Sequence, residues 1–197
     1  MSLSYSYAGN LEDGESAYVK GDYKTAYNLF LIEAKKGTAL AQKNLGVMYE
    51  KGRGVSQDYK ESVKWYSLAA EQGVASAQYN LGFMYANGEG ALQDYNKAFK
   101  WWLLAAKQGD STAQTSLGVM YAKGNGVLPD YKEAVKWWLL ASEQGVAEAK
   151  CYLALMYAEG LGIQRDLKTA KKLAKEGFDA GAEYCLEIWK EYNLANY

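Results

Sequence analysis

The sequence repeats with a period of 36 residues. When the 197-residue chain is shifted against itself by 36 positions, five glycines align without an insertion or deletion. These glycines are Gly37, Gly73, Gly109, Gly145 and Gly181. A repeat of this size indicates a stacked array of one supersecondary unit, because such a unit cannot bury its apolar face alone and must pack against its neighbours. The period therefore predicts a repeat protein.

The residues after each of these glycines predict a helix, which we call helix A. Small and large apolar residues recur at positions i, i+4, i+5 and i+8, which form one stripe along a helix. The columns are Ala41, Ala77, Ala113 and Ala149; Leu45, Leu81, Leu117 and Leu153; Gly46, Gly82 and Gly118; and Tyr49, Tyr85, Tyr121 and Tyr157. The mixture of small and large side chains favours close packing of this stripe against a second helix.

Each helix A is followed by two glycines one residue apart and then by an aspartate. In the first full repeat these are Gly52, Gly54 and Asp58. Glycine at the end of a helix indicates a left-handed cap, and the aspartate can accept backbone N–H bonds at the start of a second helix, helix B. The spacing of Asp58 and Glu61, which recurs in the third full repeat, predicts capping boxes that stabilise helix B by about 1 kcal/mol each.

Helix B carries aromatic residues in two adjacent columns, and adjacent residues on a helix cannot face the same way. We expect the first column to face the core; it holds Trp65, Trp101 and Trp137. The second column then lies toward a flank, either packed on the next repeat or partly exposed; it holds Tyr66, Trp102 and Trp138. Exposed flank tryptophans would favour self-association.

These elements predict an all-α solenoid of helix-turn-helix repeats with about eleven helices. The sequence is interpreted as one repeat domain, residues 1–197, whose terminal units differ from the others. It consists of an N-terminal cap with a shortened repeat (1–36), four full repeats (37–72, 73–108, 109–144 and 145–180) and a C-terminal capping helix (181–197). The terminal helices are expected at about residues 10–20 and 182–195.

The composition argues against several classes of function. Lys and Arg number 22 and Asp and Glu number 23, so the net charge is −1 and we expect no nucleic-acid partner. The lysine-rich stretch 168–175 is interrupted at core spacing and is interpreted as a solvated face. No apolar run approaches the roughly 20 residues that span a bilayer. The chain has no histidine, and we predict no catalytic, cofactor or metal site.

The first full repeat resembles the consensus of the Sel-one-like repeat family, relatives of the tetratricopeptide repeat with a longer loop within each repeat. The residues that carry the resemblance are Ala41, Leu45, Gly46, Tyr49, Gly52, Gly54, Val55, Asp58, Trp65, Ala69 and Gly73. Three further copies follow, and the resemblance covers about residues 22–181; in the last copy Ala154 replaces Gly and Leu173 replaces Trp. The resemblance implies a right-handed superhelix with a concave face lined by the A helices, which serves as a scaffold or adaptor for proteins.

The resemblance also implies where a partner protein or peptide binds. By analogy with the tetratricopeptide fold, the groove is lined by the helix A columns beside the core stripe. The candidate binding residues are Lys43, Asn44, Val47, Lys51, Tyr79, Asn80, Phe83, Asn87, Thr115, Ser116, Val119, Lys123, Cys151 and Tyr152. The lysines and asparagines could hold a carboxylate or a peptide backbone, and Tyr79 and Phe83 could supply an apolar anchor. One column changes chemistry at every repeat, as ligand recognition would require, although exposed positions also drift when they have no role.

Two other functions stay open. Some cysteine-rich relatives are linked to penicillin binding or β-lactamase activity. If this chain shared that activity, it would be a hydrolase. The sequence has no histidine and no Ser-x-x-Lys motif to support that activity, and we do not expect an enzyme. The second alternative is a self-assembling structural unit.

The two cysteines, Cys151 and Cys185, are 34 residues apart and therefore two positions out of phase with the repeat. Because this places them roughly 200° apart around their helices, we predict no direct bridge. Cys185 is interpreted as a buried structural thiol, and Cys151, on a more open column, is either structural or reactive. Two cysteines leave the redox compartment undetermined.

The N-terminal segment bears on the location of the chain. Residues 1–3 are interpreted as an expression leader, because they have neither the basic nor the apolar region of a targeting signal. Residues 11–30 resemble the mature start of bacterial relatives that follow an export signal. We therefore expect a periplasmic or secreted location, with the cytoplasm as the alternative.

Overall fold

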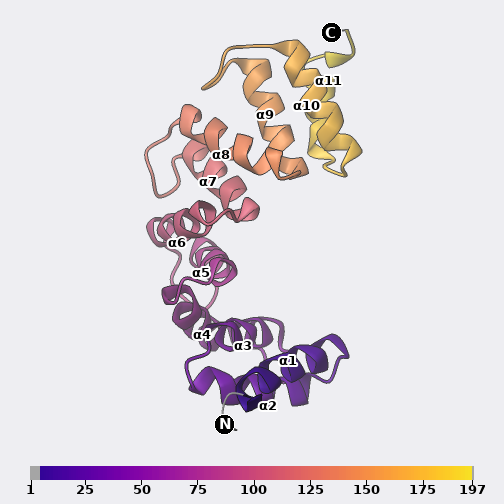
Figure 1. Ribbon diagram of the computed structural model, residues 1–197. Coiled ribbons are helices and arrows are strands. Elements are labelled where there is room, and N and C mark those ends of the chain that lie inside the picture. The colour runs from indigo at the N-terminus through magenta and orange to yellow at the C-terminus, as the bar shows by residue number, and fades with distance from the viewer. Residues whose placement is uncertain (1–4, 197) are drawn as a thin grey trace. The chain divides into compact units, whose positions relative to one another are not determined.

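The computed structural model describes residues 5–196, with the side chains of residues 9–195. Within these residues it has eleven α-helices, one short 3₁₀ helix and no β-strand, so the predicted all-α fold is confirmed. The helices, shown in chain order in Figure 1, are α1 (Tyr5–Val19), α2 (Tyr23–Lys35), α3 (Ala39–Lys51), α4 (Tyr59–Glu71), α5 (Ala75–Asn87), α6 (Tyr95–Lys107), α7 (Ser111–Lys123), α8 (Tyr131–Glu143), α9 (Ala147–Glu159), α10 (Leu167–Asp179) and α11 (Tyr184–Glu191). The last helix is shorter than predicted, because a 3₁₀ turn at Leu194–Asn196 replaces its end.

The chain divides into two compact units, residues 1–101 and 102–197. In the first unit α1 packs against α2, α2 against α3, α3 against α4 and α4 against α5. In the second unit α7 packs against α8, α8 against α9, α9 against α10, and α11 against both α9 and α10. Packing of consecutive helices is the arrangement expected of a solenoid, in which a helix pair buries its apolar face against its neighbours.

The Ala and Leu columns of helix A form the core, as predicted. The residues with no exposed surface include Ala41, Leu45, Ala77 and Leu81 in the first unit, and Ala113, Leu117, Ala149 and Leu153 in the second. The Tyr column is only half-buried. Each repeat therefore buries the same stripe and leaves the columns beside it available for other contacts.

The loop between helix A and helix B is closed by the residues that mark its ends. Gly52 adopts the left-handed conformation, with φ of 63°, and ends α3. Asp58 caps α4 by accepting two backbone N–H bonds, while its own N–H donates to the carbonyl of Tyr49. The same bond to a Tyr carbonyl recurs at Asp94, Asp130 and Asp166. Only one half of the predicted capping box therefore forms, namely the bonds that the Asp58 side chain accepts. The other half is absent because the Asp58 N–H donates to Tyr49 and the Glu61 carboxylate pairs with Lys64.

The prediction for the two aromatic columns is wrong, because the second column lies deeper in the core than the first. Tyr66, Trp102 and Trp138 are 0, 8 and 2% exposed, whereas Trp65, Trp101 and Trp137 are half-buried. The glycines of helix A explain this choice. A Cβ added to Gly46 would lie 2.5 Å from Cδ1 of Tyr66, and one added to Gly118 would lie 2.5 Å from Cδ1 of Trp138. The flat ring of the second aromatic therefore fills the space that glycine leaves open.

The last repeat changes both sides of this contact together. Ala154 stands in the Gly column of α9, and Ala174 stands in the second aromatic column of α10. Both residues are fully buried in the same core cluster. A larger residue on helix A thus accompanies a smaller one on helix B. Burial of the second column also removes the exposed tryptophans that would favour the alternative of a self-assembling unit, and that alternative stays untested.

The prediction that the cysteines are not bridged is wrong, because Cys151 of α9 and Cys185 of α11 form a disulfide with 4.9 Å between their Cα atoms. When two equivalent helices lie side by side, the residues that face each other are on opposite sides of their respective helices. A phase difference near 200° therefore directs the two cysteines toward each other and favours a bridge. Gly177 on α10 makes room, since a Cβ there would lie 3.2 Å from the Cys151 sulfur. Cys151 is fully buried and is neither a reactive thiol nor a surface residue.

Candidate functional site

The first unit has a hollow between its first three helices, which we call the N-terminal groove. Its volume is about 350 Å³, and it is lined by Glu15, Tyr18, Val19, Phe30, Lys43, Asn44 and Val47. Three of the predicted residues on α3, namely Lys43, Asn44 and Val47, therefore line one groove. The lining residues from α1 were not predicted, because α1 precedes the first full repeat and its exposed residues have no counterparts at the 36-residue spacing.

Lys43 places a partly buried positive charge in the N-terminal groove. Its side chain is half-buried, and its Nζ donates a hydrogen bond of 2.6 Å to Oδ1 of Asn44. Burial lowers the pKa of Lys43, and the negative charge of Glu15 partly offsets this effect. A partly desolvated ammonium gains most from an anionic or carbonyl oxygen, which replaces the acceptors that water no longer supplies.

Arg53 adds a second cation beside this groove. Its Nη1 donates a hydrogen bond of 2.6 Å to the hydroxyl of Tyr18. Its guanidinium carbon lies 5.5 Å from the ring centroid of Tyr18 and 5.3 Å from that of Tyr23. The bond to Tyr18 raises the pKa of Arg53, so its charge is constant. Sequence analysis missed Arg53 because it lies in the loop, where a helical phase assigns no direction to a side chain.

The remaining candidates of the first unit lie on α3 and α5 with different exposure. Lys51, Phe83 and Asn87 are exposed, and Tyr79 is half-buried. Lys51 Nζ lies 3.7 Å from a carboxylate oxygen of Glu50. Phe83 and Asn87 are therefore accessible to a partner.

Asn80 is tied to the core rather than presented freely. The Tyr66 hydroxyl donates a hydrogen bond of 2.6 Å to Oε2 of Glu50 and also bonds to the Asn80 side chain. Burial, with the neighbouring Glu50 carboxylate, raises the pKa of Tyr66, so its hydroxyl remains a donor. The contact fixes Asn80 relative to α4, and a partner would meet an amide that is already oriented.

The second unit has a larger hollow, which we call the C-terminal groove. Its volume is about 400 Å³, and it is lined by Val119, Ala122, Lys123, Tyr131, Trp138, Tyr152, Leu155, Met156, Glu159, Leu161 and Tyr184. Three predicted residues, Val119, Lys123 and Tyr152, therefore line it. The residues from α8 and α11 were missed because the analogy with the tetratricopeptide fold assigned the groove to the A helices alone.

Aromatic rings form one side of the C-terminal groove. The rings of Trp138 and Tyr152 stack with centroids 4.8 Å apart and an interplanar angle of 19°. The ring of Tyr184 lies 6.1 Å from that of Tyr152. Trp138 Nε1 donates a hydrogen bond of 3.2 Å to the carbonyl of Thr115, which fixes the orientation of the stack.

The other candidates of the second unit have partners within their own helices. The hydroxyl of Thr115 donates to the carbonyl of Ser111, and that of Ser116 donates to the carbonyl of Thr112. The inclusion of Cys151 among the accessible residues is wrong, because it is fully buried in the disulfide with Cys185. Val119, Lys123 and Tyr152 are the candidates of this unit that a ligand in the groove would meet.

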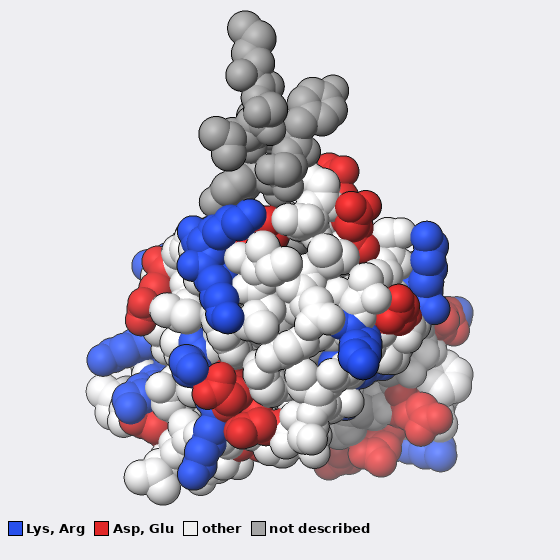
Figure 2. All heavy atoms as spheres, turned by 90° about the horizontal axis from the view of Figure 1, so that it is seen from below, with Lys and Arg blue, Asp and Glu red and all other residues white. Residues whose placement is uncertain are grey.

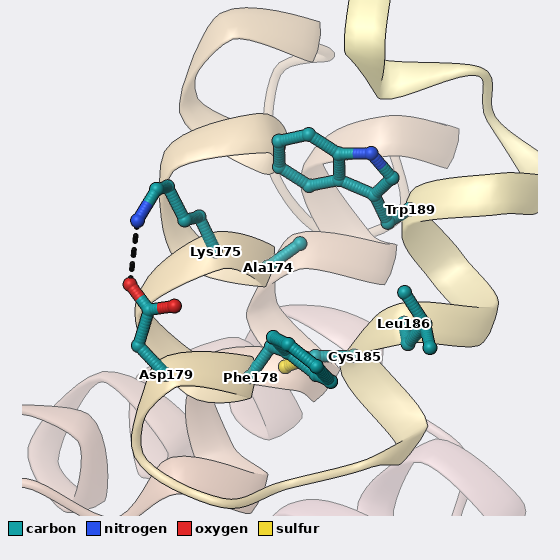
Figure 3. A pocket seen from close by; sticks show the side chains of 7 residues that line it. All are labelled: Ala174, Lys175, Phe178, Asp179, Cys185, Leu186 and Trp189. Atoms are coloured by element: carbon teal, nitrogen blue, oxygen red, sulfur yellow. Dashed lines mark hydrogen bonds and ion pairs between the residues drawn. The ribbon is translucent and has the colours of Figure 1, made fainter.

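A smaller pocket of about 230 Å³ lies between α10 and α11, and Figure 3 shows its lining. Ala174, Phe178, Leu186 and Trp189 give it apolar walls. At its edge Lys175 and Asp179 form an ion pair of 2.6 Å with each other. Because the two charges satisfy each other, this pocket has no free charge with which to select a ligand.

The described residues also limit other kinds of site. They include no group of three or more His, Cys, Asp or Glu side chains that could hold a metal ion. None of the helices in the described range is both long and apolar enough to cross a bilayer. On the face seen in Figure 2, basic and acidic side chains are interspersed, without a broad area of one sign. This face does not have the basic surface that a phosphate backbone requires.

Four consecutive segments, residues 39–74, 75–110, 111–146 and 147–181, match the sequence profile of the Sel1 repeat. The chain belongs to the Sel1 repeat family. The resemblance found in the sequence is thus confirmed, with repeats whose matched segments begin two residues after the predicted ones. Sel1 repeat proteins are generally helical scaffolds for protein interactions and are typically not catalytic.

Solved structures support the same assignment. The chain is 35% identical to c5321, a protective antigen present in uropathogenic Escherichia coli strains, with a TM-score of 0.89; the match covers 96% of this Sel1 repeat chain but only 42% of c5321. It is 36% identical to a Sel1 repeat protein from Oxalobacter formigenes, with a TM-score of 0.84 and coverage of 92% and 74%. The Helicobacter pylori cysteine rich protein B is 21% identical over 67% of this chain and 95% of its own, with a TM-score of 0.52, and shares the fold. A comparison with curated proteins found no match.

Proposed function

We propose that this Sel1 repeat protein is a scaffold that binds a partner protein or peptide through the A-helix surface of each of its two units. This surface comprises the candidate residues on α3 and α5 in the first unit and those on α7 and α9 in the second, except the buried Cys151. One observation carries the proposal: each of the two grooves is lined by three candidate residues. One candidate column, which holds Lys43, Tyr79 and Thr115, changes its chemistry at every repeat, whereas the Ala and Leu columns of the same helices are constant and fully buried.

The chemistry of the grooves supports a polypeptide as the ligand. The N-terminal groove presents the Lys43 ammonium beside the apolar side chains of Phe30 and Val47. The C-terminal groove presents the half-buried ring of Tyr152, which stacks on the buried ring of Trp138. A partner surface with carboxylates and large apolar side chains matches both, and such side chains dominate the energy of most protein interfaces.

A crosslinked pull-down from the native host tests the proposal. The test variant replaces Lys43, Phe83 and Asn87 with Ala, because all three belong to the A-helix surface and none is fully buried. We expect the yield of captured partner to fall about tenfold or more, since loss of one anchor side chain commonly weakens binding by at least that factor.

The matched control replaces Lys60, Leu68 and Glu71 of α4 with Ala. These residues are likewise one lysine, one large apolar residue and one polar residue, and they are exposed. The control should capture as much partner as the wild-type chain, and both variants should keep the wild-type circular dichroism spectrum. Equal capture by wild type and the test variant would refute binding through this surface of the first unit.

We also infer that the chain works in an oxidising compartment, which agrees with the expected periplasmic or secreted location. The disulfide between Cys151 and Cys185 supports this, because disulfides persist in oxidising compartments and are rare in the cytosol. The test is alkylation of the protein in intact host cells, with the mass read before and after reduction. Alkylation of both cysteines without prior reduction would contradict the inference.

A further inference from the structure

We infer that the C-terminal groove binds an extended peptide segment in which one aromatic or branched aliphatic side chain lies between an acidic and a basic residue. The inference rests on the proposed scaffold function and gives it a ligand class. Its basis is the combination, in a single hollow, of an aromatic wall with two oppositely charged residues that form no ion pair with any other described residue.

The size and wall of the groove define the central residue of the peptide. The volume of about 400 Å³ is within the range of roughly 300–1,000 Å³ that small-ligand sites have. Tyr152 is supported from behind by Trp138, and the exposed ring of Tyr184 lies beside it. Leu155 and Leu161 complete an apolar lining. A single large apolar side chain fits such a surface, because its burial there removes apolar area from water.

Lys123 and Glu159 define the residues on either side. They occupy the same column one repeat apart, as the last residues of α7 and α9, and both line the groove. Neither forms an ion pair within the described residues, in contrast to Lys175 and Asp179 at the pocket between α10 and α11. An acidic residue near Lys123 and a basic residue near Glu159 would complement both charges, which fixes the direction of the peptide as well as its composition.

The wall formed by the C-terminal helix is held in place. Tyr184 directly precedes Cys185, whose disulfide joins α11 to α9. The Tyr192 hydroxyl donates a hydrogen bond of 2.6 Å to Oε1 of Glu159, which orients that carboxylate. Since α9 also supplies Tyr152 and Leu155, the main parts of the groove are fixed to one helix. A site that is ordered before binding loses less conformational entropy when the peptide binds.

The experiment selects ligands without assuming a partner. A phage library of random twelve-residue peptides is panned against the immobilised, oxidised full chain, and selected peptides are then measured by fluorescence anisotropy. We expect a consensus with one aromatic or branched aliphatic residue flanked by an acid on one side and a base on the other. Lys123→Glu or Glu159→Lys should each weaken binding of the selected peptide about tenfold.

Two further variants make the result specific. The double variant Lys123→Glu, Glu159→Lys should prefer a peptide with the acid and the base exchanged. Lys107→Glu changes an exposed lysine of the same unit outside the groove and should leave affinity unchanged. Wild-type melting temperatures would show that the variants are folded.

The outcomes separate this inference from the proposed function. Selected peptides whose affinity ignores Lys123 and Glu159, or a library that yields no binder, would overturn the inference. The scaffold proposal would survive either result if the host pull-down still captured a partner that the Lys43, Phe83 and Asn87 variant loses. Failure of the pull-down as well would overturn both.

Discussion

Gly118 and Trp138 fit each other because the ring occupies the volume that a side chain on Gly118 would need. The last repeat reaches the same fit with Ala154 and Ala174, where both residues have changed. Interiors are close-packed, so a change on one side of such a contact must be matched on the other. The pair therefore behaves as one unit at the scale of single residues.

Replacing Gly118 with Ala tests this pairing. We expect Gly118→Ala to lower the free energy of unfolding by about 1–3 kcal/mol, because the ring of Trp138 must move. In a Trp138→Ala background the same change should instead raise it by up to about 1 kcal/mol, since Ala favours helix more than Gly does. Urea unfolding followed by circular dichroism measures both values. The same effect in the two backgrounds would show that the residues are independent.

Glu33 is a buried carboxylate in the N-terminal cap with three hydrogen-bond donors around it. Its side chain accepts hydrogen bonds from Asn10 at 3.0 Å, from Lys36 at 2.8 Å and from Thr38 at 3.4 Å. Burial alone would raise the pKa of Glu33, but the bonds from Lys36 and Asn10 outweigh it and the pKa lies below its ordinary value. A carboxyl group with a lowered pKa in the folded state stabilises the fold above its unfolded pKa and loses that effect as the pH falls.

The variant Glu33→Gln tests this contribution. We expect the wild type to be more stable than the variant at pH 7, and the difference to shrink as the pH falls below about 4.5, the ordinary value for Glu. Thermal melting of both proteins between pH 3 and pH 7 measures the difference. A gap that is constant over this range would mean that the charge of Glu33 has no part in stability.

At the scale of elements, each helix B begins at an aspartate whose side chain and backbone N–H both form hydrogen bonds. The Asp130 side chain accepts two backbone N–H bonds of α8, and its own N–H donates to the Tyr121 carbonyl. Asp130→Ala should therefore lower stability by about 1 kcal/mol. Glu133→Ala should change it by less than about 0.5 kcal/mol, because Glu133 contacts Lys136 at the surface and completes no capping box. Equal losses of unfolding free energy in the two variants, measured by chemical unfolding, would show that Glu133 does complete a capping box.

The disulfide has its effect on one element, α11. This eight-residue helix packs mainly against α9, α10 and the following 3₁₀ turn, and it is too short to be stable alone. Replacing Cys151 and Cys185 with Ala should lower the stability of the second unit by about 3–4 kcal/mol, the loop-closure value for a 34-residue separation. Hydrogen exchange should then rise in α11 and stay unchanged in α3. Unchanged protection of α11 would contradict this role.

At the scale of the whole molecule, the repeat predicted most of the architecture, since the period and the Gly and Asp positions indicate where helices end. The order of the two aromatic columns could not be predicted in this way, because either of two adjacent residues can face inward. The Gly column of helix A could have identified the inward-facing column, because its exception at Ala154 coincides with the small residue Ala174 in the second aromatic column.

The disulfide was missed because the phase of each cysteine was considered on its own helix and not between neighbouring helices. The lining of the two grooves was predicted only in part, because α1 and α11 lie outside the four full repeats.

Burial of the second aromatic column leads to a prediction about the oligomeric state. The large apolar side chains that remain most exposed are Leu92 at 91%, Val19 at 85% and Leu128 at 84%. Leu92 and Leu128 each lie alone in a loop between helix A and helix B, and Val19 lies at the end of α1. Single exposed apolar residues of this kind are common on monomers and do not form the large contiguous patch that association needs. We expect a mass of 21.8 kDa by size-exclusion chromatography with light scattering up to about 100 µM, a concentration at which even weak dimers form. A mass that rises with concentration, and that Leu92→Ser and Leu128→Ser together return to the monomer value, would instead identify the loops as a self-association surface.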